Sequence, residues 1–210
     1  MVPEILGYGG LILWLLIGLG AIAVLVFLER VLYYHREQIN AAEFLNGVKN
    51  VLRRNNIVEA LAICDATPGP VARLVKTAIL NRERGKEGIQ KAVEYAGLSE
   101  LPRLEQRLPL LATIAQIAPL LGLFGTVLGL IDVFYAVDQA SLVASRVQLA
   151  AGVWKGLVCT GAGLALGIPC YAAYNYLVSR MNSLLLDMEK GAVEIEQTLA
   201  DLLLQTNSST

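Results

Sequence analysis

Two threonines within long apolar stretches are the residues whose type and position most suggest chemistry. Thr126 lies six residues before Asp132, and Thr160 lies five residues after Lys155. If the stretches are helices crossing a membrane in opposite directions, a rise of about 1.5 Å per residue places both hydroxyls about 7–9 Å inside one boundary. Two hydroxyls at one depth can line a narrow polar passage, but either can instead bond to a carbonyl of its own helix. The sequence leaves both interpretations open.

Glycines accompany the threonines at spacings typical of closely packed membrane helices. Gly125 and Gly129 are four residues apart, as are Gly163 and Gly167. Small residues at this spacing allow two helix backbones to approach each other. We predict that these glycines pack the two helices together, and packing alone is a sufficient explanation for each pair taken singly.

Two charged residues are expected to lie near each other at the outer membrane surface. Asp132 follows the second apolar stretch and Lys155 precedes the third, with one short loop between the stretches. An ion pair would cancel much of the repulsion that Lys155 presents to an entering cation. Exposed ion pairs typically contribute less than about 1 kcal/mol, so two independently solvated charges are an equal alternative. Lys155 can also extend its stem to reach the interface.

Three uncharged stretches are each long enough to cross a membrane. Each contains 24 residues, and about 20 apolar residues span the hydrocarbon core. The chain is 55% hydrophobic with a mean hydropathy of +0.55, which is high for a soluble domain. We therefore expect an all-α integral membrane protein with three transmembrane helices and long cytoplasmic helical extensions. The uncharged stretches cover residues 5–28, 108–131 and 156–179.

Basic residues predict the orientation of these helices, because arginine and lysine near span ends favour the cytoplasmic side. The first stretch follows Glu4 in place of a basic segment and is long for a signal peptide, so we expect a retained anchor. The N-terminus is then outside and the C-terminus cytoplasmic. The arginines concerned are Arg30, Arg36, Arg103, Arg107 and Arg180. The expected organisation is a first transmembrane helix (1–28), a cytoplasmic helical domain (29–107), a second transmembrane helix (108–137), an outer, periplasmic loop (138–155), a third transmembrane helix (156–179) and a cytoplasmic helical extension and tail (180–210).

Helical spacing of apolar residues predicts further helices outside the membrane. A break is expected at residues 67–70, Thr-Pro-Gly-Pro, which cannot continue a helix. From Lys86 a helix-forming sequence is expected to run into the second apolar stretch, with weak interruptions at Pro102 and Pro109. The third stretch is likewise expected to extend through residues 181–205. The separate helices predicted before Lys86 cover residues 41–54, 57–65 and 71–84.

Composition argues against several classes of function. The 17 basic and 18 acidic residues nearly balance, which gives no field for binding nucleic acid. His35 is the single histidine and the three cysteines form no CxxC pair, so no metal site is expected. Cys159 and Cys170 lie about 16 Å apart along a helix, too far for a disulfide. With no catalytic constellation and no cofactor motif, we expect no enzyme activity.

Two sequence motifs resemble one family of membrane proteins. Residues 118–131 read APLLGLFGTVLGLI, which is similar to the APxxGLxGTVxGxI signature of the ExbB/TolQ proton-channel family. Residues 160–175 read TGAGLALGIPCYAAYN, similar to that family's TxxGLxxAIPxxxxYN pattern. The related flagellar stator subunits have four spans, so three predicted spans favour the ExbB/TolQ branch.

The resemblance implies a function and a set of partners. It implies a homo-oligomer, a pentameric ring, in the bacterial inner membrane, around a dimer of a single-span ExbD/TolR-like protein whose intramembrane aspartate carries the proton. Thr126 and Thr160 match the pore-lining threonines that face this aspartate. Proton flow would then drive force transmitted to the periplasm or outer membrane, with a TonB-like protein as a further partner. Lys155 departs from the pattern, because family members often have glutamate there.

Two other functions compete with this interpretation. A non-conducting membrane scaffold would use the spans only for assembly, and Thr126 and Thr160 would then tolerate valine. A small secondary transporter would need broken helices near the midplane; Pro119 and Pro169 hint at breaks, but no inverted repeat or intramembrane charge accompanies them. For the channel, we expect the second and third spans to line the ring interior and the first to face lipid.

Overall fold

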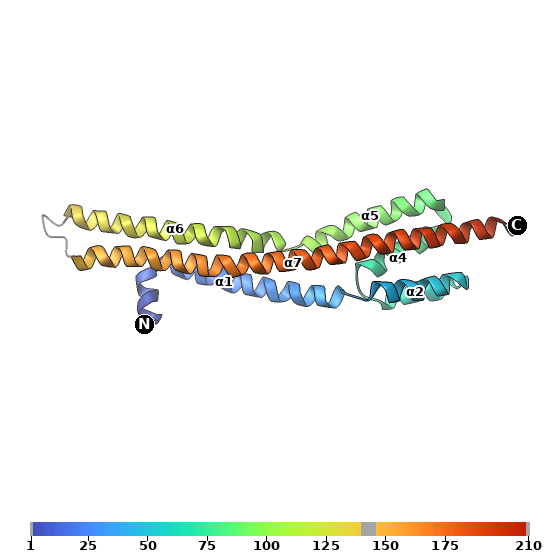
Figure 1. Ribbon diagram of the computed structural model, residues 1–210, viewed down its shortest axis with the longest axis horizontal. Coiled ribbons are helices and arrows are strands. Elements are labelled where there is room, and N and C mark those ends of the chain that lie inside the picture. Colours follow the sequence, from blue (N-terminus) through green and yellow to red (C-terminus); the bar gives the residue numbers. More distant parts are fainter. Residues whose placement is uncertain (1, 140–145, 209–210) are drawn as a thin grey trace. The chain divides into compact units, whose positions relative to one another are not determined.

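The computed structural model describes the backbone of residues 2–139 and 146–208, and side chains between residues 10 and 202 except 136 and 138–149. Throughout these residues the fold is α-helical and contains no strand. Three helices are long and apolar enough to cross a membrane, so the predicted all-α membrane fold is confirmed. The elements are α1 (Val2–Glu37), α2 (Ala41–Arg53), α3 (Ile57–Ala66), α4 (Pro70–Leu80), the 3-10 turn η1 (Arg82–Arg84), α5 (Gly85–Glu105), α6 (Leu108–Gln139) and α7 (Arg146–Ser208) (Figure 1).

The chain divides into two compact units. The first, called the span unit, comprises residues 1–29 and 107–177, and the second unit comprises residues 30–106 and 178–210. Helices α1 and α7 each contribute to both. The uncharged stretches therefore lie almost wholly in the span unit, whereas most of the charged residues lie in the second.

Within the span unit, α1 presents a buried stripe and an exposed apolar stripe. Leu16 is 3% exposed and Ala23 is 3% exposed, whereas Leu11 is 83% exposed and Leu25 is 68% exposed. Apolar side chains on both faces suit a helix that packs against protein on one side and hydrocarbon on the other. Near its start α1 bends at Gly10, whose φ of 57° lies in the left-handed region that favours glycine.

In the second unit, local sequence signals fix the ends of the short helices. Asn40 and Asn56 cap α2 and α3, each side chain accepting a hydrogen bond from the backbone amide three residues later. Gly69, with φ 111°, ends the predicted break, and a Cβ there would lie 2.8 Å from the carbonyl oxygen of Glu37. Pro70 then occupies the first turn of α4, where its missing amide hydrogen leaves no bond unmade.

The end of α1 in the second unit caps the C-terminus of α5. The Tyr34 hydroxyl donates to the carbonyl oxygen of Leu104 at 2.7 Å, and Arg30 Nη1 donates to the carbonyl oxygen of Arg103 at 3.4 Å. Both α1 side chains are buried, at 4% and 3% exposed. The last carbonyls of a helix have no partner within the helix and carry partial negative charge. A cation and a hydroxyl donor there replace the water that burial removes.

Buried Glu100 organises a second polar contact beside this cap. Arg73 of α4 donates to Glu100 at 2.9 Å and to Glu37 at 3.1 Å, while Arg103 reaches Glu100 at 3.3 Å. Burial lowers the pKa of Arg73, but the hydrogen bond and charge of Glu100 together with Glu37 outweigh it, so the pKa is raised overall. Three helices are thus joined by one arginine that stays charged.

Two expectations about helix ends are corrected by the structure. The helix expected to run from Lys86 into the second span stops at Glu105, because Arg107 adopts φ 65° and α6 begins afresh at Leu108. Pro109 lies in the first turn of α6, where its missing amide hydrogen leaves no bond within the helix unmade, which agrees with a helix that begins at this point. At the other end of the span unit, α7 begins at Arg146, so residues 146–155 of the expected outer loop are helical. Residues 140–145 of that loop lie outside the described residues.

The cap on α5 predicts a stability loss when the Tyr34 hydroxyl is removed. Tyr34→Phe should lower the free energy of unfolding by about 1–3 kcal/mol, since the buried Leu104 carbonyl loses its partner. Burial raises the pKa of Tyr34 to about 12, so this contribution is complete below the ordinary value near 10 and is lost as pH rises to about 12. Chemical unfolding of the full chain in detergent at several pH values measures it. Tyr95→Phe, at a side chain 77% exposed, should have no effect, and equal losses in both variants would contradict the assignment.

Candidate functional site

Helices α6 and α7 run side by side in the span unit (Figure 1), and glycines allow their backbones to touch. A Cβ on Gly122 would lie 2.8 Å from the carbonyl oxygen of Cys159, and one on Gly163 would lie 2.5 Å from the carbonyl oxygen of Ala118. Cβ atoms of real proteins are essentially never found that close to backbone atoms. Any larger residue at these positions would therefore push the two helices apart.

The four glycines of the two predicted pairs all lie at this contact. A Cβ on Gly125 would meet the Cβ of Cys159 at 2.4 Å, one on Gly129 would meet the Gly152 carbonyl oxygen at 2.7 Å, and one on Gly167 would meet Pro119 at 2.7 Å. Three further glycines of the contact lie outside the two predicted pairs. Gly152 and Gly156 repeat the four-residue spacing but fall at or beside the segment assigned to the loop, and Gly122 precedes Gly125 by three residues.

Close packing brings the two threonines together. The oxygen atoms Oγ1 of Thr160 and Thr126 are 3.5 Å apart, and Thr160 Oγ1 lies 3.1 Å from the carbonyl oxygen of Gly122. Thr126 donates to the carbonyl oxygen of Leu123 on its own helix at 2.5 Å. Because each hydroxyl has one proton to donate, Thr126 donates to Leu123 and Thr160 donates to its closer acceptor, the Gly122 carbonyl oxygen, while the two hydroxyl oxygens lie in contact. Thr126 therefore forms a hydrogen bond within its own helix, whereas Thr160 forms one from α7 to α6.

This arrangement can hydrogen-bond to a polar group but cannot carry a charge. Threonine hydroxyls donate and accept hydrogen bonds without ionising near neutral pH. The three uncharged stretches of this chain supply no carboxylate, amine or imidazole. A proton passing Thr126 and Thr160 would need a titratable carrier from another molecule.

Asp132 and Lys155 lie side by side near the ends of the same two helices. Lys155 Nζ is 2.9 Å from an Asp132 carboxylate oxygen, and the two side chains are 35% and 60% exposed. A Cβ on Gly10 would lie 3.9 Å from Lys155 Cε, so the bend of α1 leaves its backbone beside the lysine stem. At this exposure the pair adds at most about 1 kcal/mol to stability, and any larger effect would have to act on a passing ion.

The three cysteines of the chain are free thiols. Cys64, Cys159 and Cys170 are buried and form no disulfide with one another. Cys159 lies at the α6–α7 contact, opposite Gly125. Outside the membrane, burial and the charge of Asp65 raise the pKa of Cys64 to about 11, so its thiol stays protonated at neutral pH.

Comparison with known proteins connects these residues to a family. A model of the MotA/TolQ/ExbB proton channel family matches residues 66–190. An ExbB homolog of Methanothermobacter thermautotrophicus is 26% identical over 182 residues, covering 86% of this chain and 64% of its own length. The Tol-Pal system protein TolQ of Haemophilus influenzae is 39% identical over 98 residues, covering 47% of this chain and 42% of TolQ. The biopolymer transport protein ExbB of Neisseria gonorrhoeae is 27% identical over 189 residues, covering 83% and 84%.

Coverage differs among these relatives. The chain spans less than two thirds of the length of the first two, at 64% and 42%. The matched residues nevertheless include α6 and most of α7, and therefore both threonines and the glycine contact.

The glycine contact predicts which substitutions separate the helices. Gly122→Ala should lower the free energy of unfolding by about 1–3 kcal/mol, because its Cβ meets backbone atoms that cannot rotate away. Gly161→Ala, on α7 with no atom within 4 Å of its Cβ position, should be neutral or stabilising by up to about 1 kcal/mol through helix propensity. Equilibrium unfolding in mixed micelles compares the two. Equal effects of both alanines would show that the backbones do not touch at Gly122.

Proposed function

The chain belongs to the MotA/TolQ/ExbB proton channel family, and we propose that it is a channel subunit that couples proton flow across a membrane to mechanical work. The observation that carries this proposal is the contact between Thr126 and Thr160, with oxygens 3.5 Å apart, at the centre of a helix pair made close by glycine. Polar groups within a membrane are costly unless they face protein or water, and they commonly mark an ion path. These two threonines are the proposed proton pathway.

A partner protein must supply the group that carries the proton. This chain's uncharged stretches contain no carboxylate, amine or imidazole, so the proposed carrier is the intramembrane aspartate of an ExbD/TolR-like single-span dimer. Apolar side chains of α6 beside Thr126 remain uncovered within the chain, including Leu123 at 57% and Phe124 at 54% exposed. Their exposure supports assembly with further helices, for which we propose a pentameric ring with α6 and α7 inside and α1 facing lipid.

Location and direction of force complete the proposal. Arginines near the span ends support a topology in a bacterial inner membrane with the C-terminus in the cytoplasm and the N-terminus in the periplasm. Movement of the partner helices would transmit force to the periplasm or outer membrane, where a TonB-like protein could receive it. The competing function, a non-conducting scaffold, is favoured by one observation: Thr126 bonds to its own helix at Leu123, as a purely structural threonine does.

Valine substitutions separate the channel from the scaffold. Valine keeps the shape of threonine and removes the hydroxyl, so Thr126→Val and Thr160→Val, singly or together, should abolish proton flux while the complex still assembles. Flux is measured with a pH-sensitive dye in vesicles that contain the chain and its partner. Thr113→Val is the matched control on α6, since the Thr113 hydroxyl donates to the carbonyl oxygen of Pro109 on its own helix at 2.8 Å, and it should leave flux unchanged. Wild-type flux in the double variant would refute the pathway and support the scaffold.

The Asp132–Lys155 pair gives a second test at the outer mouth. An unpaired lysine raises the energy of a cation at a distance of about 8 Å by about 2 kcal/mol, at an effective dielectric constant near 20. Asp132→Asn should therefore reduce proton flux several-fold, and adding Lys155→Gln should restore it. The same vesicle assay measures both variants. Independent, additive losses, or full flux in Asp132→Asn alone, would rule out a functional pair.

A further inference from the structure

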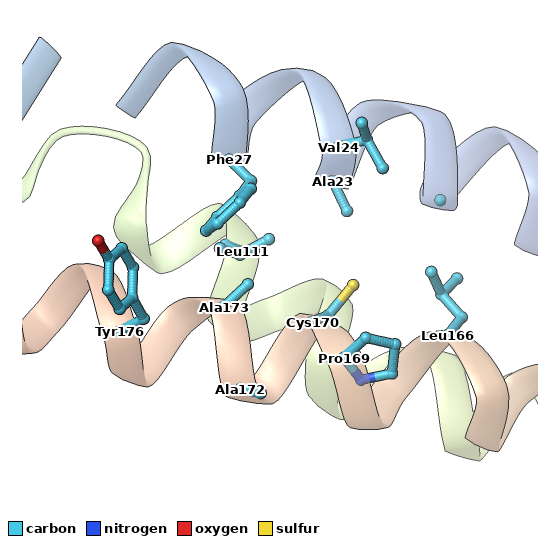
Figure 2. Close-up of a pocket in the computed structure, with 11 residues that line it drawn as sticks. Ala23, Val24, Phe27, Leu111, Leu166, Pro169, Cys170, Ala172, Ala173 and Tyr176 are labelled. Atoms are coloured by element: carbon cyan, nitrogen blue, oxygen red, sulfur yellow. The ribbon is translucent and has the colours of Figure 1, made fainter. Parts of the chain in front are cut away.

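An apolar cavity lies between α1 and α7 inside the span unit. Its volume is about 480 Å³, and Figure 2 shows Ala23 and Phe27 of α1 opposite Cys170 and Ala173 of α7, with Leu111 of α6 behind them. An apolar cavity of about 150 Å³ is large enough for a protein to bind benzene. This cavity is about three times larger, so a hydrocarbon of considerable size can enter it.

The chemistry of the lining disfavours water and charged ligands. Its side chains are aliphatic or aromatic apart from the Cys170 thiol and the Tyr176 hydroxyl, and they include no acidic residue, lysine, arginine or histidine. A buried water typically makes about three hydrogen bonds to polar groups, and these walls offer one weakly bonding thiol and one hydroxyl, so they favour an apolar occupant. An uncharged, non-polar occupant matches the cavity in both charge and polarity.

Contacts between α1 and α7 limit the size of the occupant. At one end a Cβ on Gly20 would lie 3.3 Å from Leu166 Cδ1, and at the other the rings of Phe27 and Tyr176 are 6.4 Å apart between centroids. Gly20 and Phe27 are separated by about 10 Å along the helix axis. A neighbouring helix, about 10–12 Å across with its side chains, cannot enter between these contacts. A thin, flexible hydrocarbon chain can.

The depth of the cavity identifies the source of that chain. Phe27 and Tyr176 lie one and three residues from the ends of their uncharged stretches, where aromatic rings favour the membrane interface. The cavity extends from there toward Gly20 and Leu166, deeper in the hydrocarbon. We propose that it binds one acyl chain of a phospholipid from the adjacent leaflet, without selecting a headgroup because no cation lines it. This proposal needs only the membrane spans and does not rest on proton conduction.

Photolabelling of the full chain tests the proposal. The chain is reconstituted in phosphatidylcholine vesicles containing phosphatidylcholine with a diazirine on its acyl chain, illuminated, and mapped by mass spectrometry. We expect label on Cys170 and Leu111, which are 6% and 1% exposed and so are shielded from bulk lipid. Ala173→Phe fills the cavity and should reduce this label several-fold. Ala21→Phe, an equal change on the exposed face of α1, should not, and label on exposed Leu25 should persist in every variant.

Other outcomes would overturn the proposal. Label confined to exposed residues such as Leu25 would show that lipid does not enter the cavity, as would full labelling of Cys170 in Ala173→Phe. Label that appears on the dissociated chain but is lost in the assembled complex would identify a second copy as the occupant. If Ala173→Phe does not fold, Ala173→Leu carries the same expectation, and absence of label from Cys170 and Leu111 in the wild-type chain refutes the proposal without any variant.

Discussion

The approach of two backbones at glycine is the constraint on which the candidate site depends. Gly122 and Gly163 leave no room for a Cβ between α6 and α7, and only at this separation can the Thr160 hydroxyl reach the Gly122 carbonyl oxygen at 3.1 Å. In hydrocarbon an unsatisfied hydroxyl costs several kcal/mol, roughly 4–8 on the cyclohexane scale. Helix packing and hydrogen bonding therefore depend on the same residues. The glycines that bring the helices together also bring Thr160 to its acceptor, the Gly122 carbonyl oxygen.

The two units solve the cost of buried polar groups in different ways. The span unit contributes hydroxyls and backbone carbonyls but no charge in its uncharged stretches. The second unit buries Glu100, whose charge is neutralised by ion pairs with Arg73 and Arg103. Removing one member of a buried ion pair typically costs about 3–5 kcal/mol, although the partial exposure of Arg73, at 39% of its side chain, reduces that figure. A membrane channel subunit can thus keep charge out of its spans and still use charge to fix its helices elsewhere.

Periodicity and charge predicted the helices but not all of their ends. The uncharged stretches and the proline–glycine break follow from local rules, and the structure contains both. The stop at Glu105 escaped prediction because Arg107 gives no composition signal for its left-handed φ of 65°. The start of α7 at Arg146 was not predicted either. Lys155 ends the apolar stretch, and a charged residue limits the part of a helix that lies in the membrane without ending the helix itself. The cavity could not be foreseen either, since Gly20 and Ala173 in a sequence suggest close packing as readily as open space.

The cap made by Arg30 and Tyr34 links residues that are far apart in the chain. Their acceptors on α5 follow 73 and 70 residues later. During synthesis the first helix therefore reaches the membrane long before the carbonyls of Arg103 and Leu104 exist, and Arg30 must remain hydrated throughout that interval. A hydrated arginine two residues after the first uncharged stretch resists being drawn into the bilayer. Arg30 therefore limits how deeply the first helix inserts into the bilayer before it binds the C-terminus of α5.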